Sequence, residues 1–347
     1  MNLGEAGVFL ITFRRIKILH ILEMTSLNIL LVSTIISCSL ISSVSSSWGD
    51  QSSFYQLCVE YCQKNTCANT ESFTEWSEKQ WTVDRLVGIT CSDDCRYTCM
   101  WETCHEMMHN RYGIVPQFHG KWPFIRVLGM QEPASVVFSL MNLLTNLYMI
   151  IWFRRHVSSS APMFQVWTGY GVTALIAWTC STIFHYRDTP VTEMMDYFTA
   201  FLTVLTSLLA CVLRMLGTQN TGSVMVVTAA FLAFYSNHVY NMAFIRFDYG
   251  YNMKVNVGVG VLNGVMWLVW SLLHYSDGPH VKRGVIAIIM LSLSLSLELL
   301  DFAPLMWTLD SHSLWHLATV PIPLLWFRFA AGDCNALEKQ IKSKKQQ

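Results

Sequence analysis

Charged side chains are scarce in this chain. They make up 13% of its 347 residues, and positive and negative residues balance to a formal net charge of zero. A nucleic-acid-binding protein needs an excess of lysine and arginine to pair with phosphates, so the composition argues against that class. Hydrophobic residues make up 52% of the chain, which favours a membrane protein.

Cysteine is scarce in the larger, C-terminal part of the chain and abundant before it. After Gln131 only Cys180, Cys211 and Cys334 occur. A short, thiol-dense segment in a secreted chain is typical of a domain held by disulfides. An odd number of cysteines leaves one thiol free or paired with another chain. The seven cysteines of this segment are Cys58, Cys62, Cys67, Cys91, Cys95, Cys99 and Cys104.

The first 47 residues have the features of a targeting segment. A basic cluster at residues 14–17 precedes the apolar run of residues 27–41, and the serines that follow offer a cleavage site. We therefore predict a cleaved secretory signal over residues 1–47. Met24 offers a second start, and an uncleaved membrane anchor is the alternative interpretation.

Residues 48–131 are then predicted to form a cysteine-rich lumenal domain. The secretory route leads into an oxidising compartment, where thiols pair into disulfides. Zinc is the alternative, because Cys91, Cys95 and Cys99 are spaced four residues apart and would share one helical face. The oxidising compartment favours disulfides. No Asn-x-Ser/Thr motif occurs in the chain, so it offers no acceptor for an N-linked glycan.

From Glu132 onward, long apolar runs alternate with short polar connections. A helix needs roughly 20 mainly apolar residues to cross a bilayer. We predict an all-α bundle of seven transmembrane helices over residues 132–330, followed by a basic cytosolic tail over residues 331–347. Residues 291–297 alternate leucine with serine as a strand would, but an open strand cannot satisfy its backbone in lipid, so a helix is predicted. The seven predicted spans are residues 133–153, 163–184, 193–213, 223–240, 255–274, 281–300 and 311–329.

Basic residues in the short connections predict how the bundle is oriented. Cytosolic connections of membrane proteins are enriched in lysine and arginine. With the cysteine-rich domain in the lumen, the first, third and fifth connections face the cytosol. These connections contain Arg154, Arg155, Arg214, Lys282 and Arg283.

Polar residues spaced four apart lie at the predicted lumenal ends of the second and seventh spans. On a helix, Ser181 shares a face with His185, and His312 shares a face with His316. Asp196 lies near the lumenal start of the third span, so all five side chains are predicted at one depth. An ionisable side chain at membrane depth is costly unless it is paired or binds a metal, which makes these residues functional-site candidates.

This set of side chains suits a catalytic zinc site. Three neutral imidazoles hold zinc and leave its fourth position open. We predict that Asp196 orients or deprotonates a water molecule and that Ser181 donates a hydrogen bond to a developing oxyanion. The alternative is a set of hydrogen-bonded pairs in a polar bundle core. His238, Glu298 and Asp301 lie at predicted lumenal helix ends, where they either support the site or serve as interfacial and capping residues.

Several motifs resemble those of a known family. The Ser-x3-His pair, the aspartate eleven residues after that histidine and the His-x3-His pair are similar to the signature of the seven-span superfamily of alkaline ceramidases and adiponectin-type receptors. From about residue 55 to residue 329 the chain resembles, more specifically, the Per-one-like family of post-GPI-attachment-to-proteins phospholipases. The motifs are CSDDCRYTCMW at 91–101, PQFHGKWP at 116–123, QEPA at 131–134, IRFDYGYN at 245–252 and LLDF at 299–302.

The resemblance implies an ester hydrolase of the GPI-specific phospholipase A2 type. Such an enzyme removes the sn-2 acyl chain from the phosphatidylinositol of GPI-anchored proteins, which are its substrates in the membrane. By position, the resemblance assigns zinc to the three histidines, water activation to Asp196 and a steadying role to Ser181. It also implies a framework of six cysteines, to which Cys104 is an addition, so we expect three disulfides and a free Cys104.

Two lysines near the C-terminus bear on the location of the protein. We expect a multi-pass protein of the Golgi membrane that cycles with the endoplasmic reticulum, because Lys344 and Lys345 resemble a dilysine retrieval signal. A basic tail that only satisfies the orientation rule is the alternative.

A seven-span lipid receptor or sensor and a cargo factor for GPI-anchored proteins are the competing functions. The presence of Asp196 favours turnover, since a purely structural zinc has four protein ligands.

Overall fold

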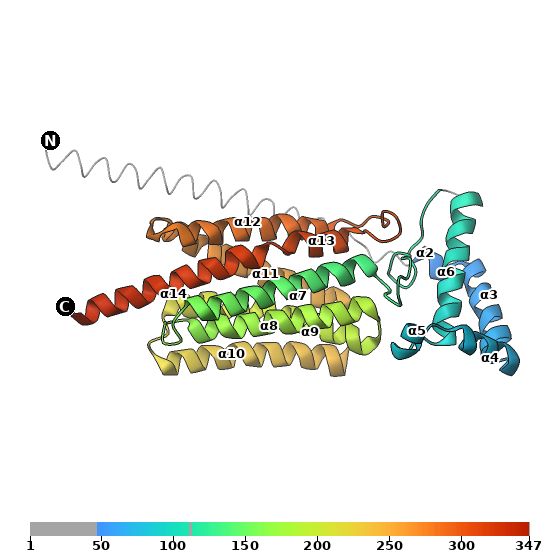
Figure 1. The fold of residues 1–347 in the computed structure, drawn as a ribbon, viewed down its shortest axis with the longest axis horizontal. Helices are drawn as coiled ribbons and strands as arrows, with labels where there is room; N and C mark the ends of the chain where they lie inside the picture. The colour runs from blue at the N-terminus through green and yellow to red at the C-terminus, as the bar shows by residue number, and fades with distance from the viewer. Residues whose placement is uncertain (1–46, 111–112, 347) are drawn as a thin grey trace.

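The computed structural model describes residues 47–110 and 113–346 (Figure 1). Helices dominate both ranges, which contain three isolated β-bridges and no strand. A cluster of short helices lies at one end of a bundle of long helices (Figure 1). The predicted targeting segment lies, except for its last residue, outside the described ranges.

Four short helices, a π-helical turn and one helix of 20 residues form the N-terminal cluster, which we call the cysteine-rich unit. Polar caps start two of them: the Ser52 side chain accepts a hydrogen bond from the Tyr55 amide, and the Asn69 side chain accepts from the amides of Glu71 and Ser72. The elements are α2 (Trp48–Gln51), α3 (Ser53–Cys62), η1 (Gln63–Cys67), α4 (Thr70–Lys79), α5 (Thr82–Leu86) and α6 (Cys91–Asn110).

Three disulfides join α3 and η1 to α6. The cysteines recur every four or five residues on each side, so they line facing surfaces of the two segments. The bonds are nested, which makes the two segments antiparallel. They use the six cysteines that the resemblance grouped, while Cys104 is free and buried. The bonds are Cys58–Cys99, Cys62–Cys95 and Cys67–Cys91.

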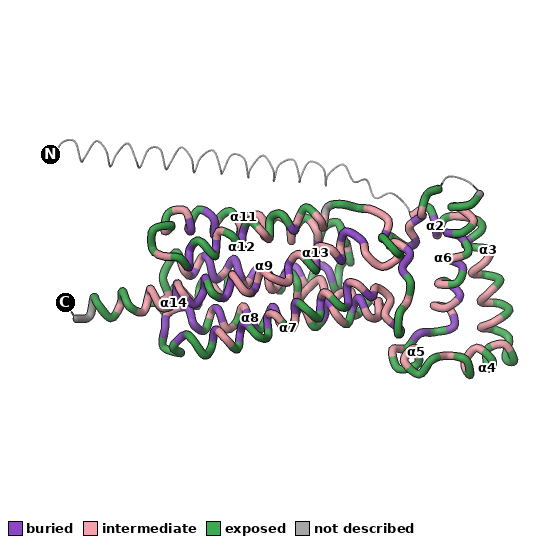
Figure 2. The backbone as a smooth tube through the Cα atoms, turned by 45° about the horizontal axis from the view of Figure 1, so that its top comes forward, coloured by how far each residue is buried: buried purple, intermediate pink, exposed green. Residues whose placement is uncertain are grey.

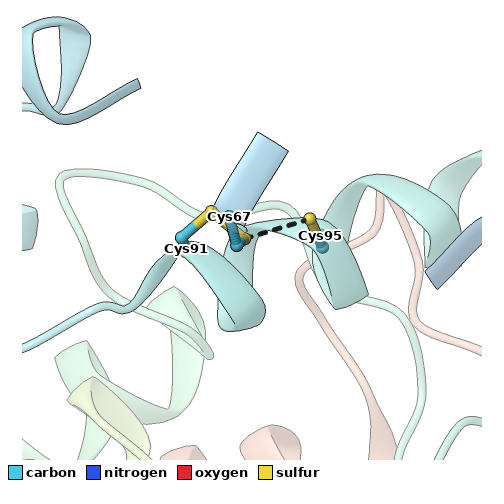
Figure 3. A group of neighbouring side chains, drawn as sticks. All are labelled: Cys67, Cys91 and Cys95. Atoms are coloured by element: carbon cyan, nitrogen blue, oxygen red, sulfur yellow. Dashed lines mark hydrogen bonds between the residues drawn. A yellow bond between two sulfur atoms is a disulfide. The ribbon is translucent and has the colours of Figure 1, made fainter. Parts of the chain in front are cut away.

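Three of these sulfur atoms lie close together without forming a metal site. Figure 3 shows Cys67 bonded to Cys91 with Cys95 beside them, and the sulfur atoms of Cys67 and Cys95 are 3.7 Å apart. Cys95 is itself bonded to Cys62. Because disulfide sulfur has no thiolate to offer, the proximity reflects two adjacent disulfides.

Removal of a disulfide should destabilise the protein measurably. The Cys58–Cys99 bond closes the largest of the three loops, with 41 residues of separation. Replacing both cysteines by serine is expected to lower the free energy of unfolding by about 2–5 kcal/mol.

Burial raises the pKa of the Cys104 thiol to about 12, so this cysteine should be alkylated only after denaturation. Thermal unfolding and non-reducing peptide mapping test both points.

The control for this prediction is Cys104→Ala, which removes a thiol without removing a crosslink. It should leave the peptide map of the three bonds unchanged. A map in which any of the six paired cysteines is free in the wild type, or in which Cys104 is bridged, would contradict the expected framework.

A helix covers each of the seven predicted spans. Val320 and Pro321 divide the last one, because proline lacks the amide that would continue the helix. The bundle consists of α7 (Pro133–His156), α8 (Phe164–Tyr186), α9 (Pro190–Leu216), α10 (Thr221–Tyr240), η2 (Asn241–Ile245), α11 (Tyr249–Leu273), η3 (Tyr275–Asp277), α12 (Pro279–Leu299), α13 (Ser311–Thr319) and α14 (Ile322–Gln346).

Five of these helical segments are long and apolar enough to cross a membrane: α7, α9, α10 with η2, α11 and α12. The protein is therefore a helical protein with several candidate membrane spans, while the count of seven stays a prediction. Threonine, glycine and serine residues make α8 less apolar, although it packs between α7 and α9. The break between α13 and α14 makes α13 too short to qualify on its own.

In α7, the first bundle helix, polar residues are buried and leucines are exposed, which is the reverse of the usual pattern in a water-soluble protein. The buried face of α7 includes the polar residues Ser139, Asn142 and Asn146 and becomes apolar from Met149 onward, whereas its exposed face includes Leu140 and Leu144. Figure 2 shows the same separation of exposed outer faces and buried inner faces around the bundle. A polar interior with an apolar exterior is expected where lipid surrounds a helix.

The apolar core fills the bundle half that lies away from the cysteine-rich unit. Trp167 and Trp267 stack there with ring centroids 5.6 Å apart. Beside them Arg214 of α9 forms a two-pronged ion pair with the buried Asp333 of α14, at 2.7 and 2.9 Å. The guanidinium also lies 4.7 Å from the ring centre of Trp270. The half nearer the cysteine-rich unit holds the predicted site.

Candidate metal centre

The three predicted histidines converge at the end of the bundle nearer the cysteine-rich unit. His185 lies in the last turn of α8, and His312 and His316 lie on α13. One ring nitrogen from each falls within 4.8 Å of the others. The Nε2 atom of His312 is 2.9 Å from Nε2 of His316 and 3.4 Å from Nε2 of His185. The three Nε2 atoms therefore face a common point.

Local sequence fixes the helix that carries two of these histidines. The Asp310 side chain accepts a hydrogen bond from the Ser313 amide at 2.9 Å, and the Ser313 hydroxyl accepts one from the Asp310 amide at 3.0 Å. This reciprocal capping box starts α13 at a defined residue. Asn142 of α7 donates to the His316 carbonyl at 2.7 Å, which ties the helix to the bundle.

Carboxylates hold the far side of two histidine rings. The Nδ1 atom of His185 is 2.6 Å from Oε2 of Glu132, and Nδ1 of His312 is 2.7 Å from Oε2 of Glu298. A carboxylate at Nδ1 keeps the proton there and leaves the Nε2 lone pair free to bind a metal. Glu132 is the N-cap residue of α7, and its mostly buried carboxylate lies between His185 and the ammonium of Lys121.

Two serines support the third histidine. The Ser139 hydroxyl lies 3.2 Å from Nδ1 of His316 and 3.1 Å from the hydroxyl of Ser181. Ser181 is buried, and its hydroxyl is linked to His316 through the hydroxyl of Ser139. This contact agrees with the steadying role that the resemblance implied, while the predicted hydrogen bond to an oxyanion stays a prediction.

Asp196 lies on α9 beside the histidines. Asp196 is partly exposed, and its carboxylate is not part of the group formed by the three ring nitrogens within 4.8 Å of one another. The nearby Arg187, which directly follows α8, donates to Asp93 at 2.8 Å. The carboxylates that bind the histidine rings are other residues, so Asp196 stays available for substrate or water.

Sequence reasoning missed Glu132 and Ser139. The one available signal for Glu132 was a carboxylate immediately before the first predicted span, at the predicted depth of the site. Ser139 gave no signal, because a serine in an apolar span more often serves helix packing. The sequence left open whether Glu298 supports the site or caps a helix. In the structure its carboxylate lies 2.7 Å from Nδ1 of His312.

Two other candidates lie away from the three histidines. His238 is buried between α10 and α11, where its Nε2 atom is 3.1 Å from Oδ1 of Asn252. It is therefore neither an exposed interfacial residue nor one of the three converging histidines. Asp301 accepts hydrogen bonds from Gln117 and Trp122, which belong to the connection between α6 and α7.

The donor set fits zinc. Imidazole nitrogens suit zinc, whereas calcium and magnesium prefer oxygen ligands. Three protein ligands match a catalytic site with one open position. Each histidine has a partner at Nδ1, which is typical of metal-binding histidines.

Loss of a supporting carboxylate should weaken metal binding without abolishing it. Glu298→Gln keeps the shape of the side chain but removes the charge that holds His312. Zinc affinity is expected to fall about 10- to 100-fold, as found when such partners are removed elsewhere. Competition with a chelator of known affinity measures this change. Glu338→Gln is the matched control, because Glu338 pairs with Lys342 near the end of α14, and equal losses in the two variants would contradict the assignment.

Fold and site together define a helical protein with several candidate membrane spans and a three-histidine cluster able to hold a metal. The model of the Per1-like family matches residues 82–334. The chain therefore belongs to the Per1-like family, as the resemblance in its motifs predicted.

Curated relatives match most of the chain. It is 41% identical over 300 residues to the GPI-specific phospholipase A2-like PGAP3 of Homo sapiens, covering 86% of this chain and 93% of that protein. It is also 41% identical over 293 residues to the post-GPI attachment to proteins factor 3 of Drosophila melanogaster, covering 83% and 90%. No solved structure matches the chain.

Proposed function

We propose that this protein remodels GPI anchors by hydrolysing the sn-2 acyl ester of their phosphatidylinositol. The observation that carries the proposal is the convergence of three histidine Nε2 atoms, each ring held at Nδ1 by Glu132, Glu298 or Ser139. The name GPI-specific phospholipase A2-like, given to relatives about 40% identical, supports the choice of substrate.

The proposed topology has seven spans, with α8 and the α13–α14 pair added to the five candidates. Residues 1–47 act as a signal, residues 48–131 form the lumenal domain that contains the cysteine-rich unit, and residues 132–330 form the hydrolase bundle. Residues 331–347 form the cytosolic tail, whose first residues, including Asp333 and Cys334, are buried against the bundle. Three disulfides support a lumenal location for the unit, because such bonds persist in oxidising compartments. We place the protein in the Golgi membrane, cycling with the endoplasmic reticulum.

In the proposed mechanism His185, His312 and His316 would hold zinc. When bound, zinc supplies Lewis acidity, which polarises an ester carbonyl and makes water a stronger acid. Asp196 accepts the proton of the attacking water and passes it to the leaving sn-2 oxygen, since its carboxylate is not one of those that hold the histidine rings. Ser181 keeps Ser139 against His316 and so maintains the orientation of that ring.

Mass spectrometry of GPI anchors tests the proposal directly. Cells without this protein should carry anchors that keep an unsaturated sn-2 acyl chain, and its re-expression should remove that chain. A lipid receptor or a cargo factor would bind GPI-anchored proteins and leave the acyl composition unchanged. Identical anchors in the presence and absence of the protein would therefore refute hydrolysis and favour one of these two alternatives.

A further inference from the structure

A tight hairpin lies in the connection between the cysteine-rich unit and the bundle. Phe118 and Lys121 exchange backbone hydrogen bonds of 2.7 and 2.9 Å. The two residues between them, His119 and Gly120, have φ angles of 51° and 80°. Two positive φ angles in a two-residue turn match the right-handed twist of a hairpin, so this turn gives Lys121 a defined position.

The hairpin is anchored in the cysteine-rich unit. Phe118 is buried against Tyr55 and Cys99, and the rings of Phe118 and Tyr55 are 5.1 Å apart. The Gly49 amide donates to the Gln117 carbonyl at 2.9 Å. A side chain at Gly49 would have no room, because an added Cβ would lie 2.6 Å from the Phe118 ring. The disulfide-linked core therefore sets where the hairpin lies.

The Lys121 side chain reaches from this hairpin to the metal centre. Its ammonium binds Asp188 in the α8–α9 connection and lies 3.6 Å from Oε1 of Glu132. It also lies 4.5 Å above the ring of Phe184, the residue before His185. The other oxygen of the same Glu132 carboxylate, Oε2, is the one that holds His185 at 2.6 Å. One carboxylate thus links Lys121 to a histidine of the metal centre.

We propose that Lys121 is a positioning residue of the metal centre and that the cysteine-rich unit, which anchors its hairpin, holds it in place. The inference rests on the proposed zinc site. Glu132 is nearly buried, and a buried carboxylate needs more than one partner to stay in place. The ammonium restrains the Glu132 carboxylate from one side, so Oε2 stays directed at Nδ1 of His185. In this way the cysteine-rich unit acts on the metal centre through Lys121 and Glu132.

Zinc affinity of the full-length protein tests the proposal. Lys121→Met removes the charge and keeps most of the side-chain volume, and it should weaken zinc binding about tenfold or more in chelator competition. Lys121→Arg should recover part of the loss. Lys79→Met is the control, because Lys79 is an exposed lysine of the cysteine-rich unit that pairs with Glu75. It should bind zinc as the wild type does.

A double-mutant cycle separates positioning from general destabilisation. If Lys121 acts through Glu132, then adding Lys121→Met to Glu132→Gln should change zinc affinity by less than about twofold. Additive losses in the cycle would overturn the proposal. Peptide mapping of the three disulfides confirms that each variant is folded. If Lys121→Met does not fold, Lys121→Gln replaces it in the cycle and is judged by the same criterion.

The outcomes for the two proposals are distinct. A wild-type protein that binds no zinc overturns the proposed function and the role of Lys121 together. A wild-type protein that binds zinc no more tightly than a folded Lys121→Met variant overturns only the role of Lys121.

Discussion

Replacing His312 and His316 together by alanine is expected to abolish both zinc binding and anchor hydrolysis. These residues supply two of the three converging nitrogen atoms, and His185 alone cannot hold the metal. Elemental analysis of the purified protein should find one zinc per chain in the wild type and essentially none in the variant. Cells that depend on the variant should accumulate anchors with an unsaturated sn-2 chain.

His156→Ala is the matched control for the double variant. His156 is an exposed histidine at the opposite end of α7, where its ring stacks on Trp152. It should keep the wild-type zinc content and activity. Equal zinc in the wild type and in the double variant would show that these histidines do not hold the metal, and the proposed site would have to be abandoned.

Asp196→Asn is expected to separate catalysis from metal binding. The amide keeps the shape of the side chain and removes its ability to accept a proton. General base catalysis typically contributes about 10²- to 10⁴-fold, so hydrolysis should fall by that range while zinc content and the unfolding temperature stay near those of the wild type. Hydrolysis is measured on a GPI-anchored substrate with the purified protein, and zinc by elemental analysis.

Glu193→Gln serves as the control for Asp196→Asn. Glu193 lies one turn earlier on α9 and accepts a hydrogen bond from the Tyr197 hydroxyl at 3.0 Å. Its replacement should affect hydrolysis far less than that of Asp196. If Asp196→Asn folds, binds zinc and remodels anchors at the wild-type rate, Asp196 is not the base, and binding without turnover becomes the better explanation.

The part of the site that sequence could predict depends on local spacing. The four-residue separation of His312 and His316 puts both on one helical face, and the structure brings His185 to them. The partners of these rings depend instead on packing between helices far apart in the chain. Glu132 precedes its histidine by 53 residues, and Ser139 precedes His316 by 177. No local periodicity encodes such pairs.

The positions of the bundle helices could also be predicted from local sequence. Which of these helices cross the membrane was harder to predict. Long apolar runs gave the positions of all seven, including the serine-rich run that forms part of α12. Hydropathy leaves α8 out of the candidate spans because polar residues lower its mean value, and two of them, Ser181 and His185, are buried in the bundle. A helix that lines a functional site loses apolar character for that reason, so composition understates its depth in the bundle.

The ion pair between Arg214 and Asp333 limits where a tag can be fused to this protein. A boundary at residue 330 falls inside α14, and a fusion that replaces the residues after it would leave Arg214 without its carboxylate. Loss of one partner of a buried ion pair typically costs about 3–5 kcal/mol. Cys334, which follows, is completely buried in the same core. Fusions for purification or imaging should therefore retain the chain at least through Cys334.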